Sequence, residues 1–493
     1  MHKFTKDMLT YANRETVYAK AMIVSRWLSA ALLLVLCSAA LQARASSPSR
    51  HSSNVQRQQV SLPSYPAQDT PEQYNQALYL RYYHPQTQAE APETIIILIP
   101  GLFSGAMSME RFAHQLLEGY PSREVWVIER RANLLEDRSA ALQSLRSRDP
   151  GVALRYYLRD AGTSAGFQAI TAAEADFVRH WGLTVHLRDL HVVVQRARAK
   201  ASRLILGGHS LGASIVSLYA AYDFTDDPLL VHSSLQTPDS AYLEARIGAD
   251  LLDGLLLLDG VLGKTGGFDL AGGVVMEALG VQLSLRALQD YPQLPPFLNP
   301  TPFAQAEAIA IAAQLAPEIF STTLSDYLVG TARRTLGEDS WWLEAARVAL
   351  AAGMRRFVEQ GIAEAYARSL EALGMEPRIA LWGFIDSRSS LDSNASEWYF
   401  PLRLLLDTSL PDVSLQNQAG FVGNNHVAVA TLVLGAEQGL VNRLEDIYPY
   451  RQARAAASPF AMHILANTSH VSILSAELNP AIALVQDWLA SIP

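Results

Sequence analysis

The sequence predicts an α/β fold built on a mostly parallel sheet. Short apolar runs rich in β-branched residues or leucine alternate with helical segments along the chain, which is the pattern of strands and crossover helices. The run Thr94–Ile99 (TIIILI) is continuously apolar after its first residue, as is typical of a strand buried on both faces of a parallel sheet. A glycine-rich turn also joins the strand candidate Arg203–Leu206 to an apolar helix.

The totals of the chain fit a large folded protein. Of 493 residues, 49% are hydrophobic and 18% are charged, so the bulk of the chain can bury a core and is not intrinsically disordered. The formal net charge of −9 argues against a nucleic-acid partner, which requires clustered Lys and Arg. A single cysteine excludes a disulfide framework and any zinc or iron–sulfur site made of cysteines.

The N-terminal segment has the pattern of a secretory signal peptide. Arg26 precedes the apolar run Trp27–Leu41, and the small-x-small sequence Ala43-Arg44-Ala45 follows it. The run is shorter than the ~20 residues that span a membrane. We therefore expect residues 1–45 to be removed, with Met22 as an alternative start. The mature chain should then be secreted or periplasmic, without a stable membrane span.

The rest of the chain divides by composition and period. Residues 46–70 form a polar linker, 71–260 a first part of the core, 261–376 a helical cap, and 377–493 a second part of the core with a further insertion at about 387–458. That insertion includes a predicted helix at Val427–Val441. The predicted strands are Ala77–Tyr83, Thr94–Ile99, Glu124–Ile128, Arg203–Leu206, Leu255–Leu258, Ile379–Trp382 and Met462–Leu465. The predicted helices are one around Phe112–Leu117, Val185–Lys200, Ala213–Tyr222 and a last one with Asn479 as its N-cap and Pro480 at its first position.

The sharpest chemical motif is Gly208-His209-Ser210-Leu211-Gly212, between a strand and a helix. A side chain on such a tight turn needs strained backbone angles, and glycines two residues before and after it relieve the crowding. Ser210 is therefore the predicted nucleophile.

A serine hydroxyl needs a neighbouring base. His470 follows the last predicted strand, and ligand chemistry in open α/β sheets occurs at the carboxyl ends of strands. We expect His470 to be this base. His426 is its main rival, His209 should point away from Ser210, and His463 should lie within a strand, facing the core or a helix.

A carboxylate should orient the histidine. Asp386 is the first choice, because it follows the predicted strand Ile379–Trp382 and lies between the serine and the histidine in chain order. Asp259, at the end of Leu255–Leu258, is the runner-up and is interpreted first as a helix or turn cap. Asp392 is third.

The oxyanion of an acyl-transfer intermediate needs two N–H donors. The backbone amide of Leu211, directly after the nucleophile, is one candidate. The other should come from the loop Pro100–Gly105 after the first buried strand, with Leu102 preferred and Phe103 as the alternative.

Together these motifs resemble the α/β-hydrolase family, and more specifically its serine esterases and lipases, over about residues 77–260 and 377–493. The resemblance implies an eight-stranded, mostly parallel sheet with helices on both faces and a lid between the sixth and seventh strands, where Gly260–Glu376 lies. It carries over Ser210 as nucleophile, His470 as base and Asp386 as acid. The oxyanion loop begins with Pro-Gly where many members have His-Gly, which leaves backbone donors intact.

These observations predict an exported serine hydrolase that cleaves a small or lipid-like carboxylic ester through an acyl-enzyme. An acyltransferase with the same triad and a catalytically silent binding protein are the alternatives. No cofactor or metal is expected, since the acidic pairs of the chain match no calcium loop. Arg130-Arg131 and Arg333-Arg334 are interpreted as solvated faces. The aromatic residues of the insertion would suit an apolar acyl group but are interpreted first as the cap's own core; they are Phe268, Phe297, Phe303, Phe320, Trp341 and Trp342.

Overall fold

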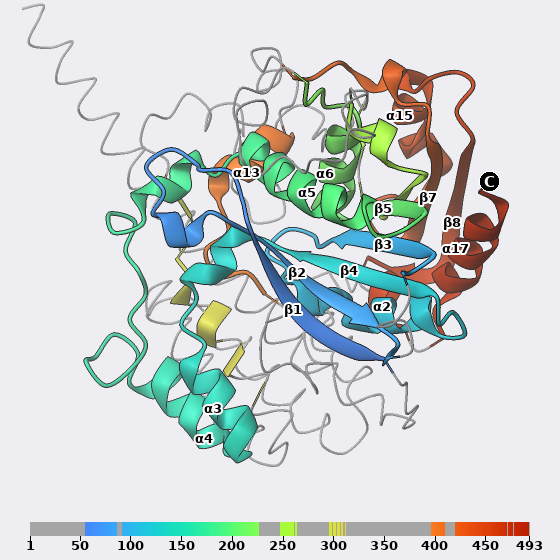
Figure 1. Ribbon diagram of the computed structural model, residues 1–493. Coiled ribbons are helices and arrows are strands. Elements are labelled where there is room, and N and C mark those ends of the chain that lie inside the picture. The colour runs from blue at the N-terminus through green and yellow to red at the C-terminus, as the bar shows by residue number, and fades with distance from the viewer. Residues whose placement is uncertain are drawn as a thin grey trace, which may run out of the picture.

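A computed structural model gives the fold of the chain (Figure 1). It describes residues 55–85, 91–225, 247–260, 396–409 and 420–470, most of 472–492, and short pieces between 262 and 311. The predicted signal peptide, most of the predicted cap, the strand Ile379–Trp382 and both Asp386 and Asp392 lie outside the described residues.

One eight-stranded sheet organises the described chain, in the order β1-β2-β4-β3-β5-β6-β7-β8. From β3 to β8 all neighbouring strands are parallel, whereas β2 runs antiparallel to both β1 and β4. This order and these directions are those of the α/β-hydrolase fold, as the sequence predicts. The strands are β1 Gln56–Pro63, β2 Gln76–Tyr83, β3 Thr94–Ile99, β4 Arg123–Glu129, β5 Arg203–His209, β6 Gly254–Leu258, β7 Ala430–Gln438 and β8 Phe460–Ser469.

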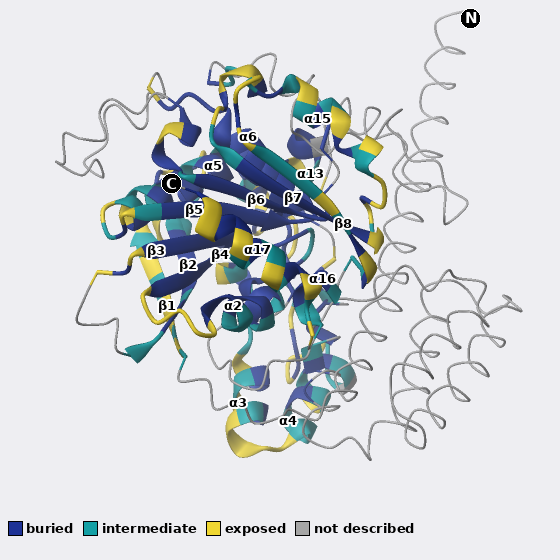
Figure 2. Cartoon of the chain, turned by 90° about the vertical axis from the view of Figure 1, so that its right-hand side faces the viewer, coloured by how far each residue is buried: buried dark blue, intermediate teal, exposed yellow. Residues whose placement is uncertain are grey.

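Helices cover both faces of this sheet (Figures 1 and 2). Helices α5 (Leu183–Arg198), α6 (Leu211–Ala220) and α13 (Leu402–Ser409) pack on one face. Helices α2 (Glu110–Leu117), α16 (Ser472–Ser475) and α17 (Pro480–Ser491) pack on the other. Two short helices, α3 (Ser139–Ser147) and α4 (Pro150–Leu154), extend away from the sheet. Helix α15 (Tyr448–Ala453) belongs to the segment of chain that connects β7 to β8.

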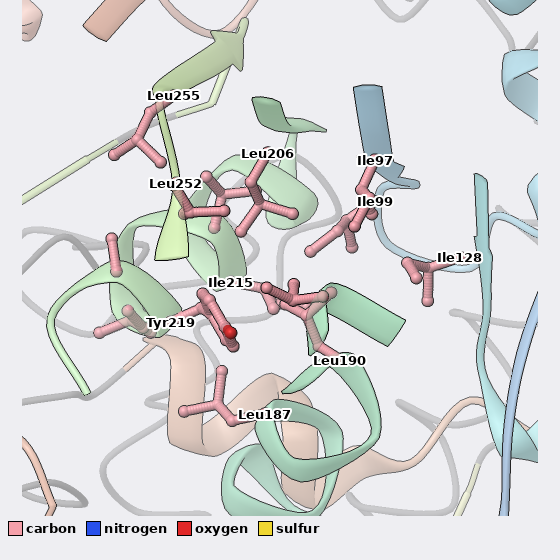
Figure 3. Close-up of a cluster of buried hydrophobic side chains, with 14 of the residues drawn as sticks. Ile97, Ile99, Ile128, Leu187, Leu190, Leu206, Ile215, Tyr219, Leu252 and Leu255 are labelled. Carbon is pink, nitrogen blue, oxygen red and sulfur yellow. The ribbon is translucent and has the colours of Figure 1, made fainter. Parts of the chain in front are cut away.

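The alternation of side chains along β3 builds two cores. Ile97 and Ile99 point toward α5 and α6, where they meet Leu190 and Ile215 in the cluster drawn in Figure 3. Ile96, between them, belongs to the opposite core under α2 and α17. Every residue of β3 is buried, so its unbroken apolar run is what a strand with two covered faces requires.

Most predicted elements are confirmed within one or two residues of their predicted bounds. The last helix begins as its cap predicts, since the Asn479 side chain accepts a hydrogen bond of 3.0 Å from the Ala481 N–H. The predicted strands Leu255–Leu258 and Met462–Leu465 both lie inside sheet strands, β6 and β8.

Two assignments are wrong. Val427–Val441, predicted as a helix within an insertion, contains strand β7, which lies between β6 and β8, so residues 387–458 are not wholly an insertion. Ala, Leu, Glu and Gln in Ala430–Gln438 favour helix locally, but pairing with β6 and β8 overrides that preference. Part of the predicted linker, Gln56–Pro63, is β1 and pairs with β2 along its length.

Two of the predicted cap aromatics fall among the described residues. Phe297 and Phe303 are buried in a third cluster, together with Trp181 and Trp398, so both contribute to a local core as expected. Among the helices that the structure describes, none is long and apolar enough to cross a membrane.

The core also holds buried neutral histidines. Burial lowers the pKa of His191 to about 3. Its ring stacks on Phe224 at 3.9 Å between centroids, and its Nδ1 shares a 3.0 Å hydrogen bond with the Tyr219 hydroxyl. Below about pH 6.5 an unfolded chain would protonate this histidine while the folded chain would not.

We therefore predict that the free energy of unfolding falls as pH is lowered from about 6.5 toward 3. His191→Phe should reduce the slope of this fall by an amount that corresponds to at most one bound proton. One proton corresponds to about 1.4 kcal/mol per pH unit. Urea unfolding at a series of pH values measures the slope. Tyr219→Phe, which keeps the imidazole, is the control and should retain proton uptake; an unchanged slope in His191→Phe would contradict the prediction.

Candidate active site

Ser210 lies on a sharp turn between β5 and α6. Its backbone has φ 56° and ψ −122°, a left-handed conformation that a residue with a side chain rarely adopts. Such a residue costs of the order of 1–3 kcal/mol and persists only where its surroundings fix it. One of these constraints is a 2.9 Å hydrogen bond from the Ser210 N–H to the carbonyl of Leu258, at the end of the neighbouring strand β6.

The glycines around this turn are required by close contacts. A Cβ on Gly208 would overlap the backbone of Gly212, and one on Gly212 would overlap the carbonyl of Ile99. A Cβ on Gly101 would lie 3.0 Å from the Ser210 Cβ. The elbow interpretation of the motif is thus supported by packing, and the loop after β3 lies directly against Ser210.

His470 and Asp259 form a hydrogen-bonded pair at the carboxyl ends of β8 and β6. The His470 Nδ1 lies 2.6 Å from the Asp259 Oδ2, and the Asp259 side chain is fully buried. A carboxylate bound to Nδ1 fixes the ring's orientation and leaves Nε2 as the nitrogen available to a substrate or nucleophile. An imidazole held in this way is able to accept a proton at Nε2, which is the role proposed for His470 below.

Asp259 also holds the turn that follows β7. Its Oδ1 accepts hydrogen bonds from the N–H groups of Ala436 (3.1 Å) and Val441 (2.9 Å), and its Oδ2 accepts one from Leu440 (3.0 Å). Burial alone would raise the pKa of Asp259, but the hydrogen bond from His470 and those from the backbone outweigh it, so the pKa lies below its usual value. The carboxylate stays charged beside the imidazole.

Gly439 packs against this carboxylate. A Cβ at position 439 would overlap the Asp259 carboxyl group, so only glycine lets the turn close over it. The turn cap that the sequence suggests for Asp259 is real, and the same oxygens that cap the turn also bind the histidine.

The backbone of His470 is held by His209, the residue before Ser210. The His209 Nε2 donates a 2.7 Å hydrogen bond to the His470 carbonyl, and the two rings lie 4.4 Å apart. Burial lowers the pKa of His209 to about 3, with the charge of His470 acting in the same direction, so this donor is a neutral imidazole. Contacts therefore run in a closed ring: Ser210 to Leu258, Asp259 to His470, and His470 back to His209.

The predicted oxyanion donors belong to two segments that adjoin Ser210. Leu211 is the first residue of α6, directly after Ser210. Leu102 follows Gly101, the residue that touches Ser210. Phe103, the alternative, has φ 56°, and its ring contacts that of Phe303 in a tilted arrangement and that of Phe400 edge-on, with 5.5 and 5.1 Å between ring centroids.

The other sequence candidates fall elsewhere. His426 is exposed in a short 3-10 helix, Asn424–His426, and His463 is exposed on β8 rather than facing the core. Asp386, the first choice for the acid, lies outside the described residues, and the carboxylate that the structure places on His470 is that of Asp259, the runner-up. The reason lies in the strand order. Asp259 follows β6 and His470 follows β8, two strands away, and the turn after β7, which lies between them, binds the Asp259 carboxylate.

Sequence reasoning missed the arginines beside the site. Arg130 and Arg131 are not solvated: they are 4% and 1% exposed. Arg131 pairs with Asp189 on α5, and Arg130 pairs with Glu397 at 2.7 Å. An Arg-Arg pair after an apolar strand carries no local signal of burial, because its partners lie 58 and 267 residues away in the chain.

No group of three or more histidine, cysteine or acidic side chains is arranged to hold a metal ion within the described ranges. The chemistry of the described site is that of a serine, an imidazole, a carboxylate and backbone amides.

No family model matches the sequence, and no curated protein is similar to it at the sequence level. Solved structures are similar at low identity. A thioesterase domain from the curacin biosynthetic pathway is 12% identical, with 88% of this chain and 100% of that chain covered and a TM-score of 0.35. A peroxisomal α/β-hydrolase from Saccharomyces cerevisiae is 10% identical (89% and 90% covered, TM-score 0.37), and a putative lipase from Acinetobacter baumannii is 16% identical (90% and 93% covered, TM-score 0.33). The fold assignment itself rests on the strand order and strand directions.

Proposed function

We propose that the chain is a serine hydrolase that cleaves carboxylic esters through an acyl-enzyme. The observation that carries this proposal is the closed ring of contacts that joins a serine in a left-handed turn to a His470–Asp259 pair. Such a constellation is the requirement for turning a hydroxyl into a nucleophile.

In the first step the Ser210 Oγ attacks the ester carbonyl carbon while His470 Nε2 takes the hydroxyl proton. The C=O electron pair moves onto oxygen, and this oxyanion accepts hydrogen bonds from the backbone amides of Leu102 and Leu211. When the intermediate collapses, His470 returns the proton to the leaving alcohol. Water then attacks the acyl-enzyme by the same sequence, releasing the acid and restoring Ser210. Asp259 holds the imidazole and stabilises its charged form throughout.

The aromatic surroundings of the oxyanion loop favour an apolar acyl group. Phe103 directly follows a proposed donor, and its ring contacts Phe303 and Phe400. Phe103 is partly exposed and is backed by the buried rings of Phe303 and Phe400, so an apolar side chain lies beside the proposed position of the carbonyl oxygen, and esters of apolar acids are the proposed substrates.

Hydrolysis of p-nitrophenyl esters of increasing acyl length tests the proposal. We predict that the full chain hydrolyses them and that Ser210→Ala reduces kcat to the background rate, since this variant lacks the hydroxyl that forms the proposed acyl-enzyme. Ser217→Ala is the matched control, because Ser217 is a buried serine on α6, the helix that directly follows Ser210, and it should retain wild-type activity. Full activity in Ser210→Ala would reject the serine mechanism.

The identity of the acid is tested by two asparagine variants. Asp259→Asn should lower kcat by up to about 10⁴-fold, because an amide at this position favours the wrong tautomer of His470. Asp386→Asn should change kcat less than about threefold. Thermal melts of both variants separate loss of chemistry from loss of fold. The opposite ranking of the two variants would assign the acid to Asp386.

We further propose that the protein is exported, as its N-terminal pattern suggests. Cleavage after Ala45 would give a secreted or periplasmic chain that begins at Ser46. Mass spectrometry of the protein recovered from secreted and periplasmic fractions should find this N-terminus. A protein that retains residues 22–45 in every fraction would exclude cleavage.

A further inference from the structure

We propose that Arg130, held by Glu397, is a positioning residue that fixes the Leu102 amide as an oxyanion donor. The inference rests on the proposed function and adds a part to it: a buried ion pair behind the oxyanion loop. It is carried by the contacts of Arg130 with the loop and by the geometry of the peptide unit.

The sheet places the oxyanion loop between Arg130 and Ser210. Strand β3, which leads into the loop, pairs with β5 on one side and with β4 on the other. Ser210 follows β5 and Arg130 follows β4. All three strands are parallel, so their carboxyl ends share one edge, and the loop has the nucleophile on one side and the guanidinium on the other.

The Arg130 guanidinium binds the carbonyl groups of this loop. Its Nη2 donates to the Pro100 oxygen (2.6 Å) and to the Gly101 oxygen (3.1 Å), and its Nη1 donates to the Ser104 oxygen (3.2 Å). Three carbonyls of one five-residue segment are thus turned toward a single side chain. Five N–H donors in one plane allow arginine to do this.

The orientation of a carbonyl fixes that of the next amide. The Gly101 carbonyl and the Leu102 N–H belong to the same peptide unit, and no described peptide bond is cis. In a trans peptide the C=O and N–H bonds point in opposite directions. With the Gly101 oxygen on Arg130, the Leu102 N–H points away from the guanidinium, toward the side on which Gly101 meets Ser210.

The Leu102 amide has no competing acceptor in the described part of the chain. No backbone hydrogen bond from it occurs there, whereas the Phe103 carbonyl accepts the Glu397 N–H at 3.0 Å. Three carbonyls of the loop accept hydrogen bonds from Arg130, whereas the Leu102 N–H remains available to a substrate oxygen.

Glu397 holds Arg130 in place. Its Oε2 lies 2.7 Å from the Arg130 Nη1, and its side chain is fully buried. Its backbone N–H binds Phe103, and its neighbour Ser396 forms a β-bridge with Ser104. One residue therefore supports the loop twice, through its backbone and through the charge that fixes Arg130.

Arg131 provides a matched comparison. It is equally buried and ion-paired, but its contacts are with Asp189, Asn75 and Tyr65, and none is with the oxyanion loop. Replacing Arg131 should weaken the fold without moving the loop. A purely structural role for Arg130 would make its variants behave like those of Arg131.

The test compares a p-nitrophenyl ester with its thionoester, in which sulfur replaces the carbonyl oxygen. Sulfur is larger and accepts hydrogen bonds poorly, so the oxygen/sulfur ratio of kcat/KM reports how well the oxyanion donors are formed. In the full-length protein, Arg130→Gln should lower kcat for the oxygen ester by about tenfold or more, with KM within about twofold. The oxygen/sulfur ratio of kcat/KM should fall by a similar factor. Glu397→Gln should give a smaller change in the same direction, and Arg131→Gln should keep the wild-type ratio.

A wild-type ratio in Arg130→Gln, or equal losses on both substrates, would overturn the proposal. If Arg130→Gln does not fold, Glu397→Gln decides, because it keeps the side-chain shape and removes only the charge; a wild-type ratio there also overturns it. Ser210→Ala is run in the same assay. Retained activity in that variant would reject the serine mechanism itself, which separates the two failures.

Discussion

Close packing of backbone around Ser210 is the constraint on which the rest of the site depends. The left-handed serine is tolerable only because β5, α6 and the loop after β3 leave it no other conformation. Gly208, Gly212 and Gly101 make that approach possible, each at a place where a side chain would meet a neighbour. The N–H of Ser210 is bound to the carbonyl of Leu258 at the end of β6, so the strand that leads to Asp259 also holds Ser210. The contacts that hold this strained turn thus come from three neighbouring strands, β3, β5 and β6.

Asp259 extends this coupling to the last two strands. Four donors share one buried carboxylate: the imidazole of His470 and three N–H groups of the turn after β7. Without them the cost of burying an ionised carboxylate would shift it toward its neutral form. With them its pKa falls, and the charge that an imidazolium needs is already in place and already solvated by the protein. Preorganised charge of this kind acts without reorganisation when the proton moves.

What the sequence predicts correctly here is local. The apolar run of β3, the glycines of the elbow and the Asn479-Pro480 start of α17 each follow from a few consecutive residues. What it misses is long-range. Strand β7 contains good helix formers and is a strand because β6 and β8 flank it. The ranking of Asp386 above Asp259 followed chain order, whereas the contact with His470 depends on which strand ends meet across the sheet.

Burying the Arg130–Glu397 ion pair beside the oxyanion loop has a cost in free energy, and this cost helps to explain its role. Burial raises the pKa of Glu397 to about 7 while Arg130 opposes that rise, which shows how strongly the site disfavours the charge it holds. For stability alone, apolar residues of similar volume often do as well as a buried ion pair. Apolar residues could not, however, bind the carbonyls of Pro100, Gly101 and Ser104, and the Gly101 carbonyl would keep only the long 3.4 Å hydrogen bond from the Ser104 N–H. The ion pair supplies donors to these carbonyls. In the mechanism that we propose, the same hydrogen bonds that stabilise the loop also direct the Leu102 N–H toward Ser210, where an oxyanion would form.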